Sequence, residues 1–263
     1  MSILTVPFFT ASKSSCSSFD GGAVIKDTTT INSDEIINYK SKSEMKKFYK
    51  KARIPTPRYT MVSTLSKAKP FIERVGYPVV VKPDIGVGAS HTYQINNEEE
   101  LVSFFSNLPK EGPYIMEELI IGDIITYDGI CDSEGNVLVE ASHITPPIMN
   151  VVNSHTDVSY YTNIKVSNRL SSVGKRAIKA FNVKSRFFHL EFFKLKETKR
   201  GLGKQGRYVA LEANMRPGGG YTPDMINFAN SFDIYQLWAD MVAYNKIKHS
   251  YVGDKYYCVY ASR

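Results

Sequence analysis

Two acidic residues and an amide lie in two segments that resemble neighbouring β-strands. Residues 186–194 read R-F-F-H-L-E-F-F-K, and residues 208–220 read Y-V-A-L-E-A-N-M-R-P-G-G-G. Side chains alternate between the two faces of a strand, so Glu212 and Asn214 share one face. If the strands pair as a hairpin, Glu191 faces Glu212 beside Asn214. Two carboxylates and an amide oxygen are hard ligands that suit Mg²⁺, although two acids on a solvated face explain this segment alone equally well.

The remainder of the two strands extends this pattern. Arg216 is expected on the same face as the acid and amide of its strand, directly before a Pro-Gly-Gly-Gly turn where backbone can approach a ligand closely. In the first strand, Glu191 is expected to share a face with His189 and Phe193. The other face of the second strand is predicted to be apolar and to consist of Val209, Leu211, Ala213 and Met215.

A lysine and a glycine-containing loop form a second candidate site. Residues 77–83 are a β-branched run predicted as a buried strand, which ends near Lys82 and opens into the loop D-I-G-V-G-A-S-H at 84–91. Residues 92–95 return as a strand. A cation beside unobstructed backbone N–H groups suits phosphate binding. The spacing matches neither the Walker loop nor the Rossmann fingerprint, and a plain hairpin turn explains the loop equally well.

Helices that must position these residues are predicted from apolar periodicity and capping signals. A helix is expected from Lys42 to about Ala52, because Ser41 and Glu44 form an S-x-x-E capping box. The sequence I-P-T-P ends it, since proline disfavours a helical conformation in the residue before it. Further helices are expected at 65–75, at 98–108 after an Asn97 cap, after a Ser167 cap, and at 233–244.

Further strands are expected at 113–120, 124–131 and 137–143, the last two joined by a polar turn at 132–136. Residues 144–162 are predicted to be a long loop, and the tyrosine-rich tail after residue 250 to include a last strand. Residues 1–38 carry few signals, with a strand expected at 3–10 and a loop at 11–22. The domain organisation therefore depends mainly on the segments after Lys42.

Composition indicates a soluble globular protein of 263 residues, with 43% hydrophobic and 22% charged residues. No apolar run approaches the ~20 residues of a membrane helix, and no signal peptide is recognisable. Three widely spaced cysteines favour reduced thiols and a cytoplasmic location. The net charge of +7 comes from scattered Lys and Arg, apart from the segment 194–207, so a solvated hairpin loop is favoured over a nucleic-acid surface. Neither a G-x-S-x-G elbow nor an H-E-x-x-H motif is present.

From about Lys42 to Trp238 the chain resembles ATP-grasp domains, a superfamily that includes carboxylate–amine ligases and the large chain of carbamoyl-phosphate synthetase. Five motifs occur in order: a lysine opening a helix that ends in I-P-T-P, V-V-V-K-P with its glycine loop, M-E-E-L-I-x-G, H-L-E-F-F, and L-E-A-N-M-R-P-G-G-G. The resemblance implies an α+β fold in which two subdomains with mainly antiparallel sheets grip ATP. The implied domains are an N-terminal remnant at 1–40 and an ATP-grasp domain at 41–263. The latter divides into a small subdomain with the glycine flap at about 77–120 and a metal-binding subdomain at about 121–263.

The resemblance also implies roles for individual residues. Lys42 and Lys82 match the lysines that hold the phosphates, while Arg216 and Lys82 match residues at the reacting groups. Glu117 and the backbone that follows it match the hinge that reads the adenine edge. The implied nucleotide-binding residues are Lys42, Lys82, Gly86, Gly88, Ala89, Ser90, Glu117, Glu118, Leu119, Ile120 and Asp123. The implied metal ligands are Glu191, Glu212 and Asn214.

The activity that the resemblance implies uses ATP and Mg²⁺, or Mn²⁺ in its place. A carboxylate is activated as an acylphosphate, which an amine or similar nucleophile then attacks. Two alternatives stay open: a catalytically incomplete ATP-binding subunit, and a carbamoyl-phosphate-synthetase-like half that acts on bicarbonate or carbamate. Small-molecule substrates are expected, and neither nucleic acid nor a membrane is an expected partner.

Two departures from the family pattern stand out. Ile124 occupies the position where the family usually has a glutamate that binds the ribose, so either Asp123 is the substitute or the ribose is bound more weakly. Only 41 residues precede Lys42, where the family normally has a full α/β domain. Either a partner chain supplies that domain, or this protein builds its substrate pocket differently. A homodimer is a further alternative that stays open.

Overall fold

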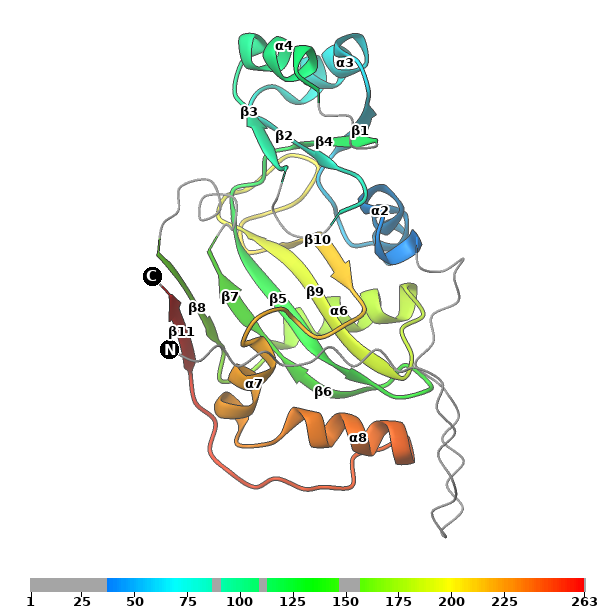
Figure 1. Cartoon of the computed structure of the whole chain (residues 1–263), viewed down its shortest axis with the longest axis vertical. Coiled ribbons are helices and arrows are strands. Elements are labelled where there is room, and N and C mark those ends of the chain that lie inside the picture. The colour runs from blue at the N-terminus through cyan, green and yellow to red at the C-terminus, as the bar shows by residue number, and fades with distance from the viewer. Residues whose placement is uncertain (1–36, 87–90, 109–112, 147–156, 263) are drawn as a thin grey trace.

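The fold consists of two antiparallel β-sheets with helices packed against them (Figure 1). A computed structural model describes residues 37–86, 91–108, 113–146 and 157–262. The smaller sheet has the strand order β1-β4-β2-β3, and the larger has the order β10-β9-β5-β7-β8-β11 with β6 beside β5. All described strand pairs are antiparallel. The predicted α+β class with antiparallel sheets is therefore confirmed.

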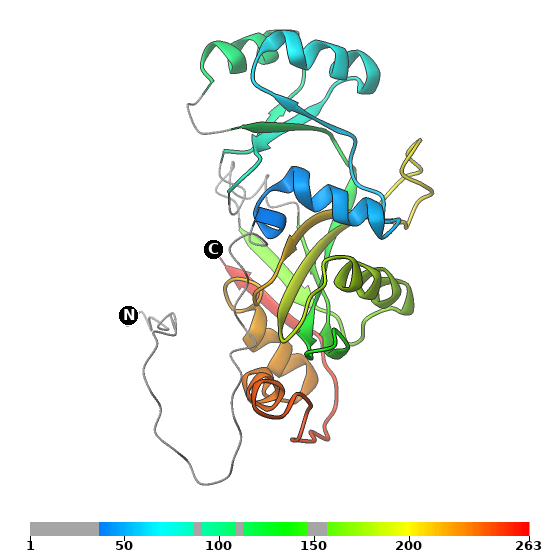
Figure 2. The ribbon, with the colours of Figure 1, turned by 90° about the vertical axis from the view of Figure 1, so that its right-hand side faces the viewer.

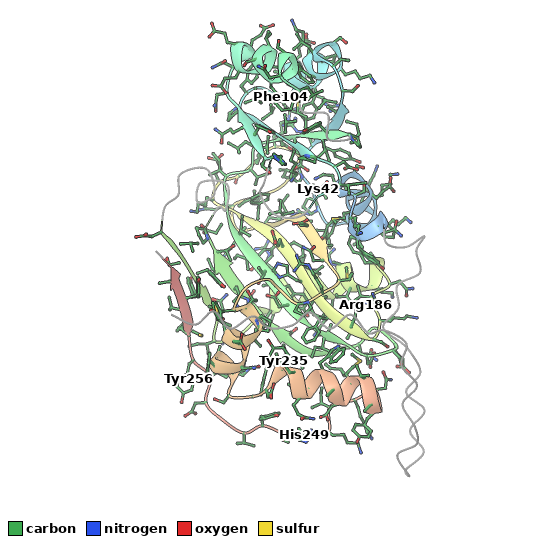
Figure 3. All side chains as sticks on the ribbon, in the orientation of Figure 1. Lys42, Phe104, Arg186, Tyr235, His249 and Tyr256 are labelled. Atoms are coloured by element: carbon green, nitrogen blue, oxygen red, sulfur yellow. The ribbon has the colours of Figure 1, made fainter. Side chains whose placement is uncertain are left out.

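The smaller sheet is covered on one face by two helices. Its strands are β1 (Tyr59–Val62), β2 (Val79–Pro83), β3 (Tyr93–Ile95) and β4 (Tyr114–Glu118), and its helices are α3 (Leu65–Val75) and α4 (Glu98–Ser106). Phe104 of α4, labelled in Figure 3, packs in the core between helices and sheet. Asn97 caps α4 as predicted by accepting a hydrogen bond from the Glu100 backbone N–H. This sheet already includes β1, which lies N-terminal to the expected boundary at residue 77.

The larger sheet contains the two strands that carry the acidic residues. Its members are β5 (Gly122–Cys131), β6 (Val137–Ala141), β7 (His143–Thr145), β8 (Val158–Thr162), β9 (Arg186–Leu195), β10 (Tyr208–Asn214) and β11 (Cys258–Ser262). The expected last strand is thus confirmed. The expectation of one long loop over 144–162 is wrong at both ends, because β7 and β8 are strands. They pair with each other, and β8 also pairs with β11.

Helices lie on both faces of the larger sheet. On one face, α2 (Lys42–Lys51) and α6 (Asn168–Ala180) share a core with Phe188, Leu190 and Phe192 of β9. Figure 2 shows both helices on the same side of the sheet. On the other face, α8 (Ile234–Tyr244) packs on β5 and β6. A short 3₁₀ helix, η1 (Ile37–Tyr39), precedes α2.

Local capping chemistry explains where the helices begin. Ser41, Ser167 and Asp233 each accept hydrogen bonds from backbone N–H groups in the first turn of α2, α6 and α8. One helix, α7 (Thr222–Asn230), was not predicted. Three glycines precede it and favoured a turn, although Pro223 in its first turn is a position that proline commonly takes.

Candidate nucleotide and metal site

The structure brings Glu191 and Glu212 directly opposite each other. They are register partners in the antiparallel pairing of β9 with β10, and Asn214 pairs with His189 at the next position on the same face. The predicted hairpin pairing is confirmed. Cβ atoms of directly opposite residues lie about 5 Å apart in such a ladder, so both carboxylates and the Asn214 amide border one small region of the sheet.

A β-bulge changes the predicted faces of β10. The register shifts between Ala210 and Glu212, which leaves Leu211 as the additional residue. The prediction that Val209 shares a face with Ala213 is therefore wrong. Val209 is opposite Phe193 and lies on the Glu212 face, whereas Ala210 joins Ala213 in the core beneath α2. An inserted residue reverses the alternation, which no spacing rule reveals.

The two carboxylates repel each other. Burial and the neighbouring charge of Glu191 raise the pKa of Glu212, while the positive charges of Lys42 and Lys82 oppose that rise. Within the described ranges, the Glu212 carboxylate forms no ion pair with a cationic side chain, and no cluster of three His, Cys, Asp or Glu is arranged to hold a metal. The candidate donor set is therefore two carboxylates and one amide oxygen, whose chemistry fits a hard divalent cation.

A buried carboxylate on β4 holds two lysines from different elements. The Glu117 Oε1 atom lies 2.6 Å from Lys46 Nζ, and its Oε2 atom lies 2.9 Å from Lys82 Nζ. Burial alone raises the pKa of Glu117, but the two ammonium groups outweigh it and lower that pKa to about 2. For Lys46 the burial cost prevails, so its pKa is lowered in spite of Glu117. Lys46 was not predicted, although it lies four residues after Lys42 and such residues share a helix face.

The start of α2 is bound to the segment that leaves β2. Asp84 accepts hydrogen bonds from Ser41 Oγ at 2.6 Å and from the Ser43 backbone N–H at 2.7 Å. Lys42 Nζ donates to the Gly86 carbonyl at 3.1 Å, and burial lowers the pKa of Lys42 while Glu212 opposes the effect. These bonds hold Lys42 beside the predicted flap, at the level between the two sheets in Figure 3. Gly88, Ala89 and Ser90 lie outside the described residues.

The hinge after β4 is bound by cations from two loops. Glu118 accepts two hydrogen bonds from Arg58, one from its backbone and one from its guanidinium, each of 2.7 Å. These bonds and the Arg58 charge lower the pKa of Glu118 against the opposing effect of burial. The Lys199 Nζ atom donates to the Leu119 carbonyl at 2.6 Å, and Ile120 is buried. The loop between β9 and β10 is therefore part of the hinge, which its basic composition did not reveal.

The structure shows the surroundings of the ribose position and of Arg216. Ile124 is buried, with 6% of its surface exposed, so it presents no polar group in place of glutamate. Asp123 forms an ion pair of 2.7 Å with Lys196 at the surface. Arg216 is exposed, and its guanidinium donates to the Pro217 carbonyl at 2.8 Å. Arg216 thus contacts its own turn in this structure.

The Glu191 carboxylate contacts a network of histidine and aspartate side chains. His189 lies between two carboxylates, with Nδ1 2.5 Å from Asp128 Oδ1 and Nε2 3.1 Å from Glu191 Oε1. Burial opposes its charge, but the two carboxylates outweigh burial and raise the pKa of His189 to about 10. The second Asp128 oxygen lies 3.0 Å from His143 Nδ1. His189 is therefore a positioned cation beside Glu191, and the H-x-E spacing on one strand face was its only sequence signal.

Comparison with known families identifies the chain's domain. The sequence model of a family described as the ATP-grasp domain matches residues 75–222. This match covers more than half of the chain and includes β2, the hinge, β9 and β10. It begins after α2, so the Lys42 and Lys46 positions lie outside it.

Solved structures share the fold at low sequence identity. The biotin carboxylase domain of 2-oxoglutarate carboxylase from Hydrogenobacter thermophilus aligns with a TM-score of 0.67 and 18% identity, over 86% of this chain and 50% of that one. The L-amino acid ligase from Bacillus licheniformis aligns with a TM-score of 0.61 and 17% identity, over 80% of this chain and 49% of that one. Phosphoribosylglycinamide synthetase from Anaerococcus prevotii aligns with a TM-score of 0.59 and 21% identity, over 86% of this chain and 56% of that one. The chain thus spans about half the length of these proteins. Among the described helices, none has the length and apolarity needed to cross a bilayer.

Proposed function

The chain belongs to the ATP-grasp domain family, and on that premise we propose that it is a Mg²⁺-dependent ligase. ATP activates a carboxylate as an acylphosphate, and an amine or similar nucleophile then displaces the phosphate. The substrates are small molecules. The observation that carries this proposal is the direct opposition of Glu191 and Glu212 on β9 and β10, with Asn214 at the adjoining position.

The chemistry of this cluster favours a metal over a solvated face. Glu191 forms an ion pair with His189, and the Glu191 side chain is only 15% exposed. Glu212 has a raised pKa because it is buried beside a like charge. A bound Mg²⁺ would offset that repulsion and neutralise charge on the transferred phosphoryl group. In this proposal Glu191, Glu212 and Asn214 hold the ion.

The lysines supply the remaining positive charge. Lys42 and Lys82 act on the nucleotide phosphates, and their fields already reach Glu212. Glu117 fixes the Lys82 ammonium through a 2.9 Å ion pair, so this cation is positioned before the nucleotide arrives. Such preorganised charge is what phosphoryl transfer requires from a protein. In this proposal Arg216, which is exposed on its turn, acts on the acceptor carboxylate or the reacting phosphoryl group.

The decisive experiment removes one metal ligand. Glu212→Ala should lower ADP release by at least about a hundredfold, the scale of losing one transition-state electrostatic contact. The matched control is Glu197→Ala, which removes an exposed glutamate from the loop after β9. Substrates are found by screening pairs of carboxylates and amines for ATP-dependent phosphate release. Equal turnover of Glu212→Ala and wild type, with both folded by circular dichroism, would exclude the proposed metal role.

A second candidate is a nucleotide-binding subunit that needs a partner chain for catalysis. The buried Ile124 and the Asp123–Lys196 ion pair favour it, because neither offers the ribose a free carboxylate. In that case, isothermal titration would detect ATP binding to the purified chain, while every substrate pair would stay inactive until a partner is added. Turnover by the purified chain alone would rule this candidate out.

A further inference from the structure

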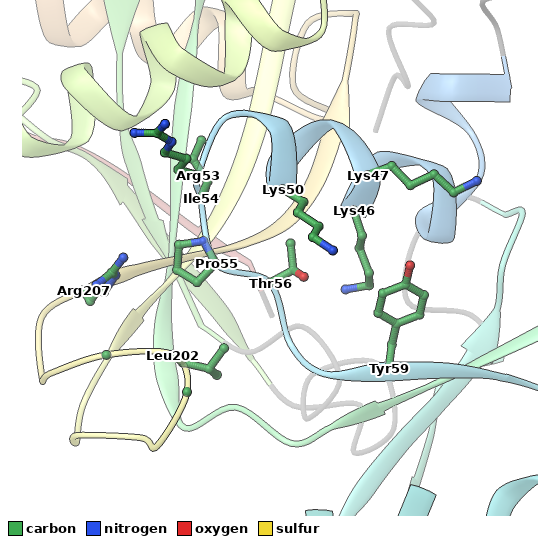
Figure 4. A pocket seen from close by; sticks show the side chains of 12 residues that line it. Lys46, Lys47, Lys50, Arg53, Ile54, Pro55, Thr56, Tyr59, Leu202 and Arg207 are labelled. Atoms are coloured by element: carbon green, nitrogen blue, oxygen red, sulfur yellow. The ribbon is translucent and has the colours of Figure 1, made fainter.

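A basic pocket lies beside the end of α2, away from the proposed metal ligands. It has a volume of about 720 Å³ and is bordered by α2, by the segment that leads into β1, and by the loop between β9 and β10 (Figure 4). Five of its twelve lining residues are cationic and none is acidic. These cations are Lys46, Lys47, Lys50, Arg53 and Arg207.

The pocket is distinct from the proposed nucleotide site. None of Lys42, Lys82 or Glu117 lines it, and neither do the three proposed metal ligands. Lys46 lies between the two regions, because it lines the pocket while its ammonium lies 2.6 Å from Glu117 Oε1 on the hinge strand. Lys46 therefore belongs both to the wall of the pocket and to the ion pair of the hinge strand.

Lys46 is a buried cation in the pocket wall. It is 4% exposed, and its Nζ atom forms a 2.6 Å ion pair with Glu117 Oε1. Its ion-pair partner, Glu117, is shared with Lys82. One shared carboxylate therefore offsets two ammonium groups, and Lys46 adds positive charge to the wall of the pocket.

Three further cations lack acidic partners in the described part of the chain. Lys47 is paired with Glu44 at 2.5 Å, but Lys50, Arg53 and Arg207 form no described ion pair. Arg207 lies folded against Gly203, where a Cβ atom would come within 2.2 Å of its Cδ. Gly203 has a φ of +135°, a conformation that side chains disfavour. Glycine at this position therefore permits both the loop conformation and the placement of Arg207 at the pocket.

We propose that this basic pocket binds a small polyanion with phosphate or carboxylate groups, separately from the nucleotide. Its volume is in the range of about 300–1,000 Å³ that is typical of small-molecule sites. Several cations lining one concavity raise the local concentration of anions and favour multiply charged ones. The guanidinium groups of Arg53 and Arg207 suit the planar or tetrahedral oxygens of such groups.

The test titrates tripolyphosphate and citrate into the full chain by calorimetry. The variant Lys50→Gln/Arg53→Gln removes two charges from the pocket, and Lys165→Gln/Arg169→Gln removes the same two residue types from an exposed surface near α6. Binding of at least one probe should weaken about tenfold or more in the pocket variant and stay unchanged in the control. A preference for tripolyphosphate would identify a phosphate ligand, and a preference for citrate a carboxylate ligand.

A second arm separates this site from the nucleotide site. The titrations are repeated with and without a saturating non-hydrolysable ATP analogue, both with the same excess of Mg²⁺ over all anions, so that only the analogue differs. Retained probe binding supports the pocket. Loss of probe binding with the analogue, equal binding by both variants, or no binding to wild type would each overturn the proposal. Failure of the analogue itself to bind would instead count against the proposed function and would leave the variant comparison to decide.

Discussion

Two acidic groups in this protein have opposite electrostatic surroundings: the single carboxylate of Glu117, and the pair formed by Glu191 and Glu212. On β4, Glu117 has a lysine on each oxygen, and its pKa is lowered to about 2. On β9 and β10, Glu191 and Glu212 face each other, and the pKa of Glu212 is raised by burial and by its neighbour. The first group is neutralised by the chain's own cations. In the second, Glu191 has an ion pair with His189, and only Glu212 has no ion pair within the described residues.

This difference separates charge used for structure from charge available to a ligand. Glu117 joins α2, β2 and β4 into one unit. The Glu191–Glu212 pair reduces stability in the absence of a cation, since like charges directly opposite on a ladder repel. Residues that destabilise the fold in this way are typical of functional sites.

The largest expected effect is at the compensated group. Glu117→Gln leaves two buried lysines facing a neutral amide, and breaking buried ion pairs in this way costs about 3–5 kcal/mol. The free energy of unfolding, measured with urea, should fall by that amount. Glu98→Gln is the control, because it breaks an exposed pair with Lys69 that contributes at most about 1 kcal/mol. A loss for Glu117→Gln no larger than that of the control would contradict the assignment.

The second effect is the pH dependence of the stability difference between wild type and Glu117→Gln. The pKa of Glu117 is depressed from 4.5 to about 2 by folding, so its stabilisation is present above pH 4.5 and is lost as the pH falls toward 2. The stability gap between wild type and Glu117→Gln should be about 2 kcal/mol smaller at pH 3 than at pH 7. Urea titrations at both pH values measure it. A gap that stays constant would mean that Glu117 is not held ionised by its lysines.

The smallest expected effect is at Glu212 and has the opposite sign. Glu212→Gln removes a repelling charge, so without divalent ions the variant should be more stable than wild type by up to about 1 kcal/mol. Adding Mg²⁺ should raise the melting temperature of wild type and leave the variant unchanged. Thermal melts in EDTA and in Mg²⁺ test both statements. A variant less stable than wild type in EDTA would show that the two carboxylates do not repel each other.

Local chemistry made much of the fold predictable. Ser41, Asn97 and Ser167 cap helices where the sequence placed them, because a side chain and its N–H partner lie within one turn. The pairing of β9 with β10 followed from apolar alternation in two adjacent runs. The proposed metal ligands stay a prediction from the family resemblance, which the register of these strands supports.

Features that depend on distant partners were not predictable. Strand β8 owes its conformation to β11, almost a hundred residues later in the chain. The bulge at Leu211 adds one residue without any local sign. In the lysine-rich helix α2, periodicity places Lys46 on the buried face, but its ion-pair partner Glu117 belongs to the smaller sheet and has no local sign in the helix.

Helix α2 is attached to both sheets, and this attachment restricts how they can move. Its first turn is bonded to Asp84 next to β2, and just beyond its last turn the Pro55 carbonyl accepts a hydrogen bond from the β10 residue Ala210 at 2.8 Å. Ten helical residues span about 15 Å, so α2 is a short connection between the two sheets. Moving the smaller sheet away from the larger one must either break the hydrogen bonds at Asp84 or pull α2 away from β10. Only the second motion displaces Lys42, because the first leaves α2 in place on the larger sheet.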